Sequence, residues 1–257
     1  MTDTAASVES ARWVGPRLRV LPIVLVLVLG MVALEVAFVA VHFVTIGATP
    51  NVHWPQWLVL TFAETVELIF ALVGIAIAKR VLPKADFGLR WPAAGRTYLG
   101  SAIFWGVAFG VIMLFADQWP ALIHLQPPEV PEAATPVNIA GWIGFELLWV
   151  GICEETLFRG LLLGILLALS PSKIRIGRTE FSTAGITVAL VFALAHAGNF
   201  AIRPFAEAFA QQIYAIALGI IYAWLRERSG SLVPAMVAHS LSDAVETGLQ
   251  FLLAGIL

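Results

Sequence analysis

Two adjacent carboxylic acids lie inside an apolar stretch of the chain, and an arginine follows them after one helical turn. The run reads Glu154-Glu155-Thr156-Leu157-Phe158-Arg159. Acidic side chains at membrane depth are costly to bury, and they mark functional sites by default. An arginine cannot lose its charge and needs a partner there. Residues four apart face each other on a helix, which pairs Glu155 with Arg159. Glu154 points elsewhere and is the candidate for chemistry.

Two later apolar runs each contain a histidine. His196 follows Phe192 by four residues, and His239 precedes Asp243 by four. A carboxylate one turn away can orient an imidazole, the side chain that most readily exchanges protons near neutral pH. A rise of about 1.5 Å per residue from the expected inner helix ends puts these groups at similar depths, in the inner half of the membrane. Together they predict a catalytic or transport site.

The composition is that of a polytopic membrane protein. The 257 residues are 60% hydrophobic and 12% charged, with a mean hydropathy of +0.88, whereas soluble domains carry about 25% charged residues. A spanning helix needs about 20 mostly apolar residues. Seven stretches qualify: 20–45, 57–78, 97–117, 137–168, 183–201, 206–225 and 232–254. We therefore expect an all-α, polytopic transmembrane helical bundle of seven spans, or eight segments if 137–168 breaks near Gly151 or Gly160.

The basic residues predict how these spans are oriented. Lys and Arg collect in cytoplasmic loops. Under seven crossings, all of the 15 Lys and Arg residues except Arg159 and Arg203 fall on one side. The opposite loops, 46–56 and 118–136, contain none. This predicts a single integral membrane domain over 1–257, in a bacterial cytoplasmic membrane, with a cytoplasmic tail at 1–19 and the C-terminus outside.

The three elements, in this order and on separate spans, resemble the CAAX protease and bacteriocin-processing (CPBP) family, the type II CAAX prenyl endopeptidases and their bacterial relatives. That family's pattern is EExxxR, then FxxxH, then HxxxN or HxxxD. This sequence matches it with Glu154 to Arg159, Phe192 to His196, and His239 to Asp243. The resemblance covers residues 137–250, the expected catalytic core, while the first three spans carry no motif of the family.

The resemblance implies an intramembrane endopeptidase that acts on a membrane-associated protein or peptide without a cofactor. Glu154 would be the general base that activates water, helped by His196. His239 and the residue at position 243 would stabilise the tetrahedral oxyanion, and Glu155, Arg159 and Phe192 would support the site. An ionised aspartate cannot donate a hydrogen to an oxyanion. Asp243 therefore either stays protonated or orients His239, and orientation is the preferred reading.

Other classes of function remain open at this stage. The same acids and histidines could bind a divalent metal, although the ligands would come from three separate helices and no HExxH is present. A non-proteolytic immunity or assembly protein, or a transporter with a buried proton relay, is the other alternative. Nucleic acid is not an expected partner, because no basic stripe with interleaved aromatic residues occurs.

Overall fold

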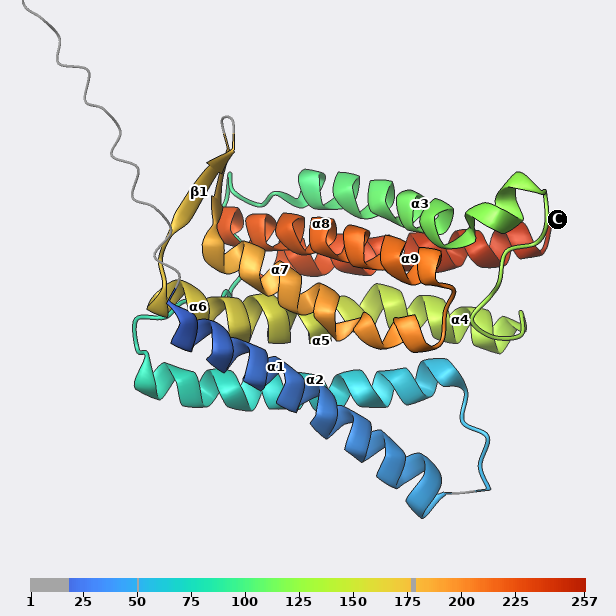
Figure 1. Cartoon of the computed structure of the whole chain (residues 1–257), viewed down its shortest axis with the longest axis horizontal. Helices are drawn as coiled ribbons and strands as arrows, with labels where there is room; N and C mark the ends of the chain where they lie inside the picture. The colour runs from blue at the N-terminus through green and yellow to red at the C-terminus, as the bar shows by residue number, and fades with distance from the viewer. Residues whose placement is uncertain (1–18, 50, 177–178) are drawn as a thin grey trace, which may run out of the picture.

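The computed structural model describes residues 19–49, 51–176 and 179–257, so most of the expected tail at 1–19 lies outside the described residues. The helices run lengthwise in one bundle (Figure 1). The first three are α1 (Val20–His42), which continues as the π-helical η1 (Phe43–Ala48), α2 (Gln56–Val81) and α3 (Leu99–Ile123). The last three are α7 (Thr183–Ala195), which leads into the 3₁₀ turn η4 (Ala197–Ala201), α8 (Phe205–Ser229) and α9 (Val233–Ala254). The predicted all-α class is confirmed.

Between α3 and α7, residues 136–169 form one unbroken helical stretch that carries the EExxxR motif. It comprises α4 (Pro136–Phe145), η2 (Glu146–Val150), α5 (Gly151–Glu155), η3 (Thr156–Leu162) and α6 (Leu163–Leu169). The chain stays helical at Gly151 and Gly160, so the eight-segment alternative finds no support. Instead η2 and η3 have π-helical turns on either side of the two glutamates. Such turns are rare and often occur at functional sites.

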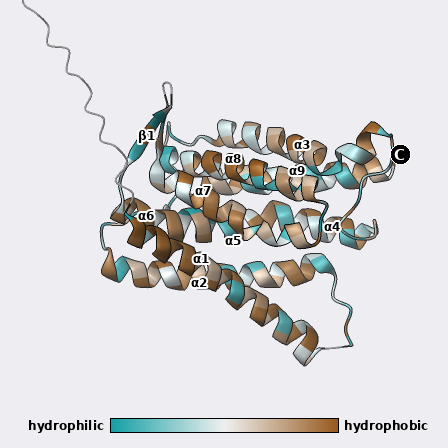
Figure 2. Ribbon diagram, in the orientation of Figure 1, coloured by the Kyte–Doolittle hydropathy of each residue, from teal (hydrophilic) through white to brown (hydrophobic). Residues whose placement is uncertain are grey.

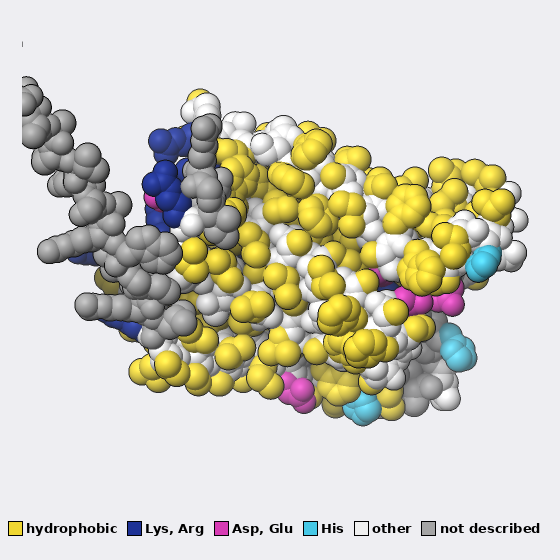
Figure 3. Space-filling model, turned by 45° about the horizontal axis from the view of Figure 1, so that its top comes forward, with side chains coloured by type: hydrophobic (Ala, Val, Ile, Leu, Met, Phe, Trp, Pro, Cys, Tyr) yellow, Lys and Arg dark blue, Asp and Glu magenta, His cyan; other side chains and the backbone are white. Residues whose placement is uncertain are grey.

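The protein is an integral membrane protein with five helices that are long and apolar enough to cross a bilayer. These are Val20–Ala48, Gln56–Val81, Leu99–Ile123, Thr183–Ala201 and Phe205–Ser229. The two other bundle helices, 136–169 and α9, carry the EExxxR and HxxxD motifs and do not meet this criterion. The count of seven spans therefore stays a prediction. Hydrophobic residues predominate along the helices (Figure 2), and apolar side chains cover much of the face shown in Figure 3.

A short β-hairpin follows α6, formed by β1 (Lys173–Ile176) and β2 (Thr179–Ser182) in antiparallel pairing. No strand was predicted here, because four residues are too few to show a clear alternation of apolar and polar side chains. The hairpin marks one end of the bundle (Figure 1). On the face shown in Figure 3, Lys and Arg side chains gather at this end, whereas a group of Asp and Glu side chains and the His side chains lie toward the opposite end. We call these the basic end and the acidic end.

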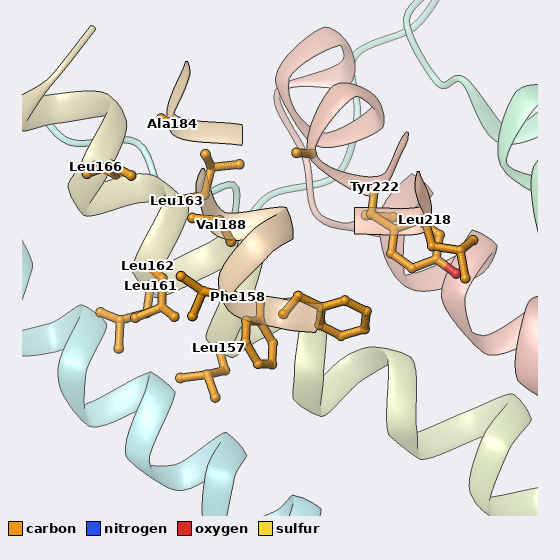
Figure 4. Packing of buried hydrophobic residues seen from close by; sticks show 14 of the residues in the cluster. Leu157, Phe158, Leu161, Leu162, Leu163, Leu166, Ala184, Val188, Leu218 and Tyr222 are labelled. Atoms are coloured by element: carbon orange, nitrogen blue, oxygen red, sulfur yellow. The ribbon is translucent and has the colours of Figure 1, made fainter. Parts of the chain in front are cut away.

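The core is densest around the helix that carries the glutamates. Leu157, Phe158, Leu161 and Leu162 are almost fully buried, and they pack against α7, α8 and the neighbouring helices (Figure 4). This packing fixes the position of the EExxxR motif within the bundle.

Glycines allow α9 to lie very close to α3. A Cβ at Gly106 would come within 2.7 Å of the Ala238 carbonyl oxygen, and one at Gly110 within 2.6 Å of the Ser242 carbonyl oxygen. Both carbonyls belong to the α9 turns around His239 and Asp243. The two glycines therefore set where the HxxxD motif lies.

Gly110→Ala should displace α9, lowering both the midpoint of thermal unfolding and any activity of the site. Forcing an extra methyl group into packed backbone costs about 1–3 kcal/mol. The matched control is Gly100→Ala on the same helix, because nothing lies within 4 Å of a Cβ there. Equal unfolding midpoints for the two variants in detergent or lipid would contradict this account of the α3–α9 contact.

The loop between α2 and α3 is attached to the start of α9. Ser231 Oγ donates a 2.5 Å hydrogen bond to the Arg90 carbonyl, and Leu232 N donates one of 3.0 Å to the Gly88 carbonyl. Gly88 has a φ of 68°, a left-handed conformation that favours glycine. These contacts hold the basic end of α9 in place and give a structural reason for the run around Ser231.

Candidate active site

Glu155 occupies the centre of the polar cluster. Its Oε1 accepts a hydrogen bond of 2.8 Å from Arg159 Nη1, and His239 Nδ1 lies at the same distance. Glu155 and Arg159 are both 0% exposed. The predicted Glu155–Arg159 pair is thus confirmed. Spacing along one helix did not predict that the same oxygen would also contact His239. This contact joins the first motif to the third.

His239 is surrounded by three carboxylates. Besides its contact with Glu155, its Nε2 lies 3.3 Å from Asp243 Oδ2 and 3.7 Å from Glu154 Oε2. The expected His239–Asp243 pair is therefore present. A protonated imidazole could donate from both nitrogens, so the ring can be held from both sides at once.

Glu154 differs from its neighbour in having no Lys or Arg of the described chain beside it. Its side chain is 15% exposed, and Oε2 has no hydrogen-bond partner among the described residues. Two buried acids of α2, Glu64 and Glu67, are its electrostatic neighbours, and Glu64 lies within hydrogen-bonding reach of it. The carboxylate is therefore available to a water molecule or a substrate.

His196 has a defined tautomer in its neutral form. Its Nδ1 lies 2.9 Å from the Phe192 carbonyl oxygen, which can only accept, so Nδ1 carries the hydrogen. In a neutral ring this leaves Nε2 as an acceptor. The ring packs edge-on against Phe192, with centroids 5.0 Å apart. The expected contact between these two residues is present, and the imidazole is suited to accept a proton.

Aromatic rings enclose the charged groups. The Arg159 guanidinium lies 4.5 Å from the centroid of Phe192 and 5.2 Å from that of Tyr222. Tyr222 also stacks on His239 at 5.0 Å, and its hydroxyl is 2.8 Å from Ser242 Oγ. The supporting position predicted for Phe192 fits these contacts. Tyr222 and Ser242 were missed, because no motif marks either residue and only the fold brings them to the site.

The four predicted catalytic residues line one cavity of about 570 Å³. They are Glu154, His196, His239 and Asp243. The cavity also reaches residues at the acidic end of the bundle, such as Gln56 and Pro131, rather than the loops of the basic end. The depth count placed the site in the inner half of the membrane. Depth estimated from the rise per residue gives the position of each side chain along its own helix. It does not predict at which end of the bundle a cavity between helices opens.

The remaining buried acids divide into two groups. Glu146 and Glu246 line the same cavity, while Glu64 and Glu67 lie on α2 next to Glu154. In contrast, Glu35 of α1 is exposed and borders a different groove. Within the described ranges, no group of three or more His, Cys, Asp and Glu side chains is arranged to hold a metal ion.

Residues 136–245 match the family model described as type II CAAX prenyl endopeptidase Rce1-like. This segment is similar to the Rce1-like family. The match begins at the first residue of α4, ends within α9, and includes every residue of the three motifs, so the resemblance inferred from them is confirmed. The helices α1 to α3 lie outside the Rce1-like segment. No curated protein and no solved structure matches the chain. The protein is therefore a membrane protein with a segment that is similar to type II CAAX prenyl endopeptidases.

Proposed function

We propose that this protein is an intramembrane endopeptidase that hydrolyses peptide bonds of a membrane-associated protein or peptide, with water activated by Glu154. The observation that carries the proposal is the position of Glu154. It is the glutamate of the EExxxR pair that faces the cavity without a Lys or Arg partner among the described residues, and His196, His239 and Asp243 line the same space. The test is cleavage of a peptide substrate by the wild type and by Glu154→Gln.

Glu154 and His196 supply the proton acceptors of the first step. Amide hydrolysis needs a base within hydrogen-bond reach of the attacking water. Glu154 takes a proton from water as the oxygen attacks the carbonyl carbon, and the neutral His196 presents a second acceptor at Nε2. The proton then passes to the amide nitrogen as the carbon–nitrogen bond breaks. One carboxyl group and one amine result.

His239 supplies the donor for the developing oxyanion. Preorganised donors at that position lower the barrier because they stabilise charge that appears only in the transition state. Glu155 Oε1 accepts from Nδ1 and orients the ring, so Nε2 is the nitrogen that donates to the oxyanion, and its hydrogen is then shared with Asp243 Oδ2 at 3.3 Å. Ser242 Oγ is 3.2 Å from Asp243 Oδ1, which helps to fix that carboxylate. In this account Asp243 positions His239 rather than donating to the oxyanion itself.

Asp243→Asn separates these two roles of Asp243. If the aspartate orients His239 as a carboxylate, the amide removes a charge beside the ring, and the dependence of rate on pH between about 5 and 8, where histidine titrates, should change. The overall rate should fall as well. Rates of both proteins are measured across this range. An Asn variant that equals or exceeds the wild type throughout would exclude the orienting role.

We further propose that the basic end faces the cytoplasm, in a bacterial cytoplasmic membrane, and that seven helices cross it. Single cysteines at Pro128 and at Arg175 should then react with an impermeant thiol reagent from opposite sides of the membrane. The native Cys153 is 0% exposed and should contribute little background. Labelling of both positions from the same side would contradict the seven-span arrangement.

A further inference from the structure

The catalytic candidates occupy only one part of the cavity. From Glu154 and His239 the cavity continues to the acidic end, where Asp117 of α3, Glu146 of η2 and Glu246 of α9 line it. We call this part the acidic arm. The chemistry proposed for the site uses none of the three carboxyl groups, and their burial needs a reason.

Two of these acids have an oxygen with no partner. Glu146 is 7% exposed; its Oε1 accepts a 2.7 Å hydrogen bond from Thr247 Oγ1, whereas Oε2 has no partner within the described part of the chain. Asp117 is also 7% exposed, and its Oδ2 accepts from Arg203 Nη1 at 3.0 Å and from the Tyr214 hydroxyl at 3.1 Å. Its Oδ1 likewise lacks a partner among the described residues. Buried polar atoms are normally satisfied.

The charges around the arm are unbalanced. Counting the described residues that line the whole cavity, the carboxyl groups are those of Asp117, Glu146, Glu154, Asp243 and Glu246. Arg203 is the only Lys or Arg in that lining. Its guanidinium already binds Asp117, and its side chain is 41% exposed. An acidic cavity of low local dielectric favours a positively charged group from outside.

We infer that the acidic arm binds a cationic group of the peptide substrate, a lysine or arginine side chain near the bond that is cut. This inference rests on the proposed function and adds the class of substrate to it. Because the arm is continuous with the space beside Glu154, a cation held there belongs to the same peptide whose carbonyl lies at the catalytic groups. Glu146 Oε2 and Asp117 Oδ1 provide the free acceptors for its N–H groups.

The arm also indicates the direction of entry. Gln56, at the start of α2, and Pro131, in the connection before α4, line the cavity at the acidic end. Neither the hairpin nor the loop between α2 and α3 contributes to its lining. A peptide would therefore reach the site from the acidic end, which is extracytoplasmic if the basic end faces the cytoplasm.

Binding can be tested without cleavage. Glu154→Gln protein in lipid nanodiscs is titrated with dye-labelled apolar peptides that differ only in one central residue, lysine, norleucine or glutamate. The lysine peptide should bind about tenfold or more tightly than the norleucine peptide, a difference of about 1.4 kcal/mol, and the glutamate peptide should bind most weakly. Because the assay measures binding and not cleavage, it tests the acidic arm independently of the proteolytic activity.

Adding Glu146→Gln to the Glu154→Gln protein should remove most of the preference for the lysine peptide. The affinity for the norleucine peptide should stay unchanged, because glutamine keeps the size of the side chain and the oxygen that accepts from Thr247. Glu246→Gln is the second arm variant, used if the first fails to fold. Glu35→Gln is the matched control, since it removes one carboxyl group of α1 outside the cavity. Equal binding of the lysine and norleucine peptides, or a lysine preference that survives both arm variants, would overturn the inference.

Discussion

Replacing Glu154 with glutamine should lower the rate of peptide cleavage by about 10²–10⁴-fold, the usual contribution of a positioned general base. The amide has the same size as the carboxylate but cannot accept a proton from water. The fold should be unaffected, because Glu154 has no ion pair with a Lys or Arg of the described chain and its side chain is partly exposed. The measurement is initial rate in lipid, with the thermal unfolding midpoint as the check on folding.

The neighbouring glutamate is the natural comparison for this variant. Glu155→Gln changes the same atoms one residue away, at a side chain that does not face the cavity as Glu154 does. If Glu155→Gln abolished cleavage in a folded protein while Glu154→Gln kept it, the two roles would have to be exchanged.

Glu155→Gln should instead have the largest effect on stability. Removing one partner of a buried ion pair costs about 3–5 kcal/mol, because the other charge is left without compensation. Arg159 is fully buried, and its Nε and Nη2 already lack partners within the described chain, so Glu155 is its main anchor. The unfolding midpoint of Glu155→Gln should therefore fall well below that of Glu154→Gln. Activity at low temperature should fall only in part, since His239 keeps its contacts with Asp243 and Glu154.

A second variant of the same pair checks this explanation. Arg159→Met removes the buried cation and should also destabilise the protein, while the double variant Glu155→Gln with Arg159→Met should be less destabilised than the sum of the two single changes. Strict additivity of the unfolding free energies would mean that the pair does not act as a unit.

The sequence predicted the helices and their local side-chain pairs well. Helix α9 was expected at 232–254 and runs over Val233–Ala254, and the pairs of Glu155 with Arg159 and of His239 with Asp243 are both formed. These features depend on apolar runs and on spacing within one helix, and both can be read directly from the residues.

Contacts between helices could not be predicted in this way. The motifs suggested one site but not that Glu155 Oε1 would contact both Arg159 and His239. Nothing in the sequence distinguishes Tyr222 from other aromatic residues of apolar helices. Its place beside His239 depends on how α8 packs against α9. The direction of the cavity likewise depends on the angles between helices, which spacing along one helix does not determine.

The central claim is that this protein cuts peptide bonds, and the most direct test is to look for the new ends. Purified wild-type protein in lipid vesicles is incubated with a library of membrane-associated peptides that includes basic sequences, and mass spectrometry identifies the products. We expect new carboxyl and amino termini with the wild type, none with Glu154→Gln, and no change when a metal chelator is added. Loss of cleavage with the chelator, restored by added metal, would indicate a metal-dependent protease. Products that are identical for the wild type and Glu154→Gln, or no cleavage by a folded wild type across the library, would contradict the assignment.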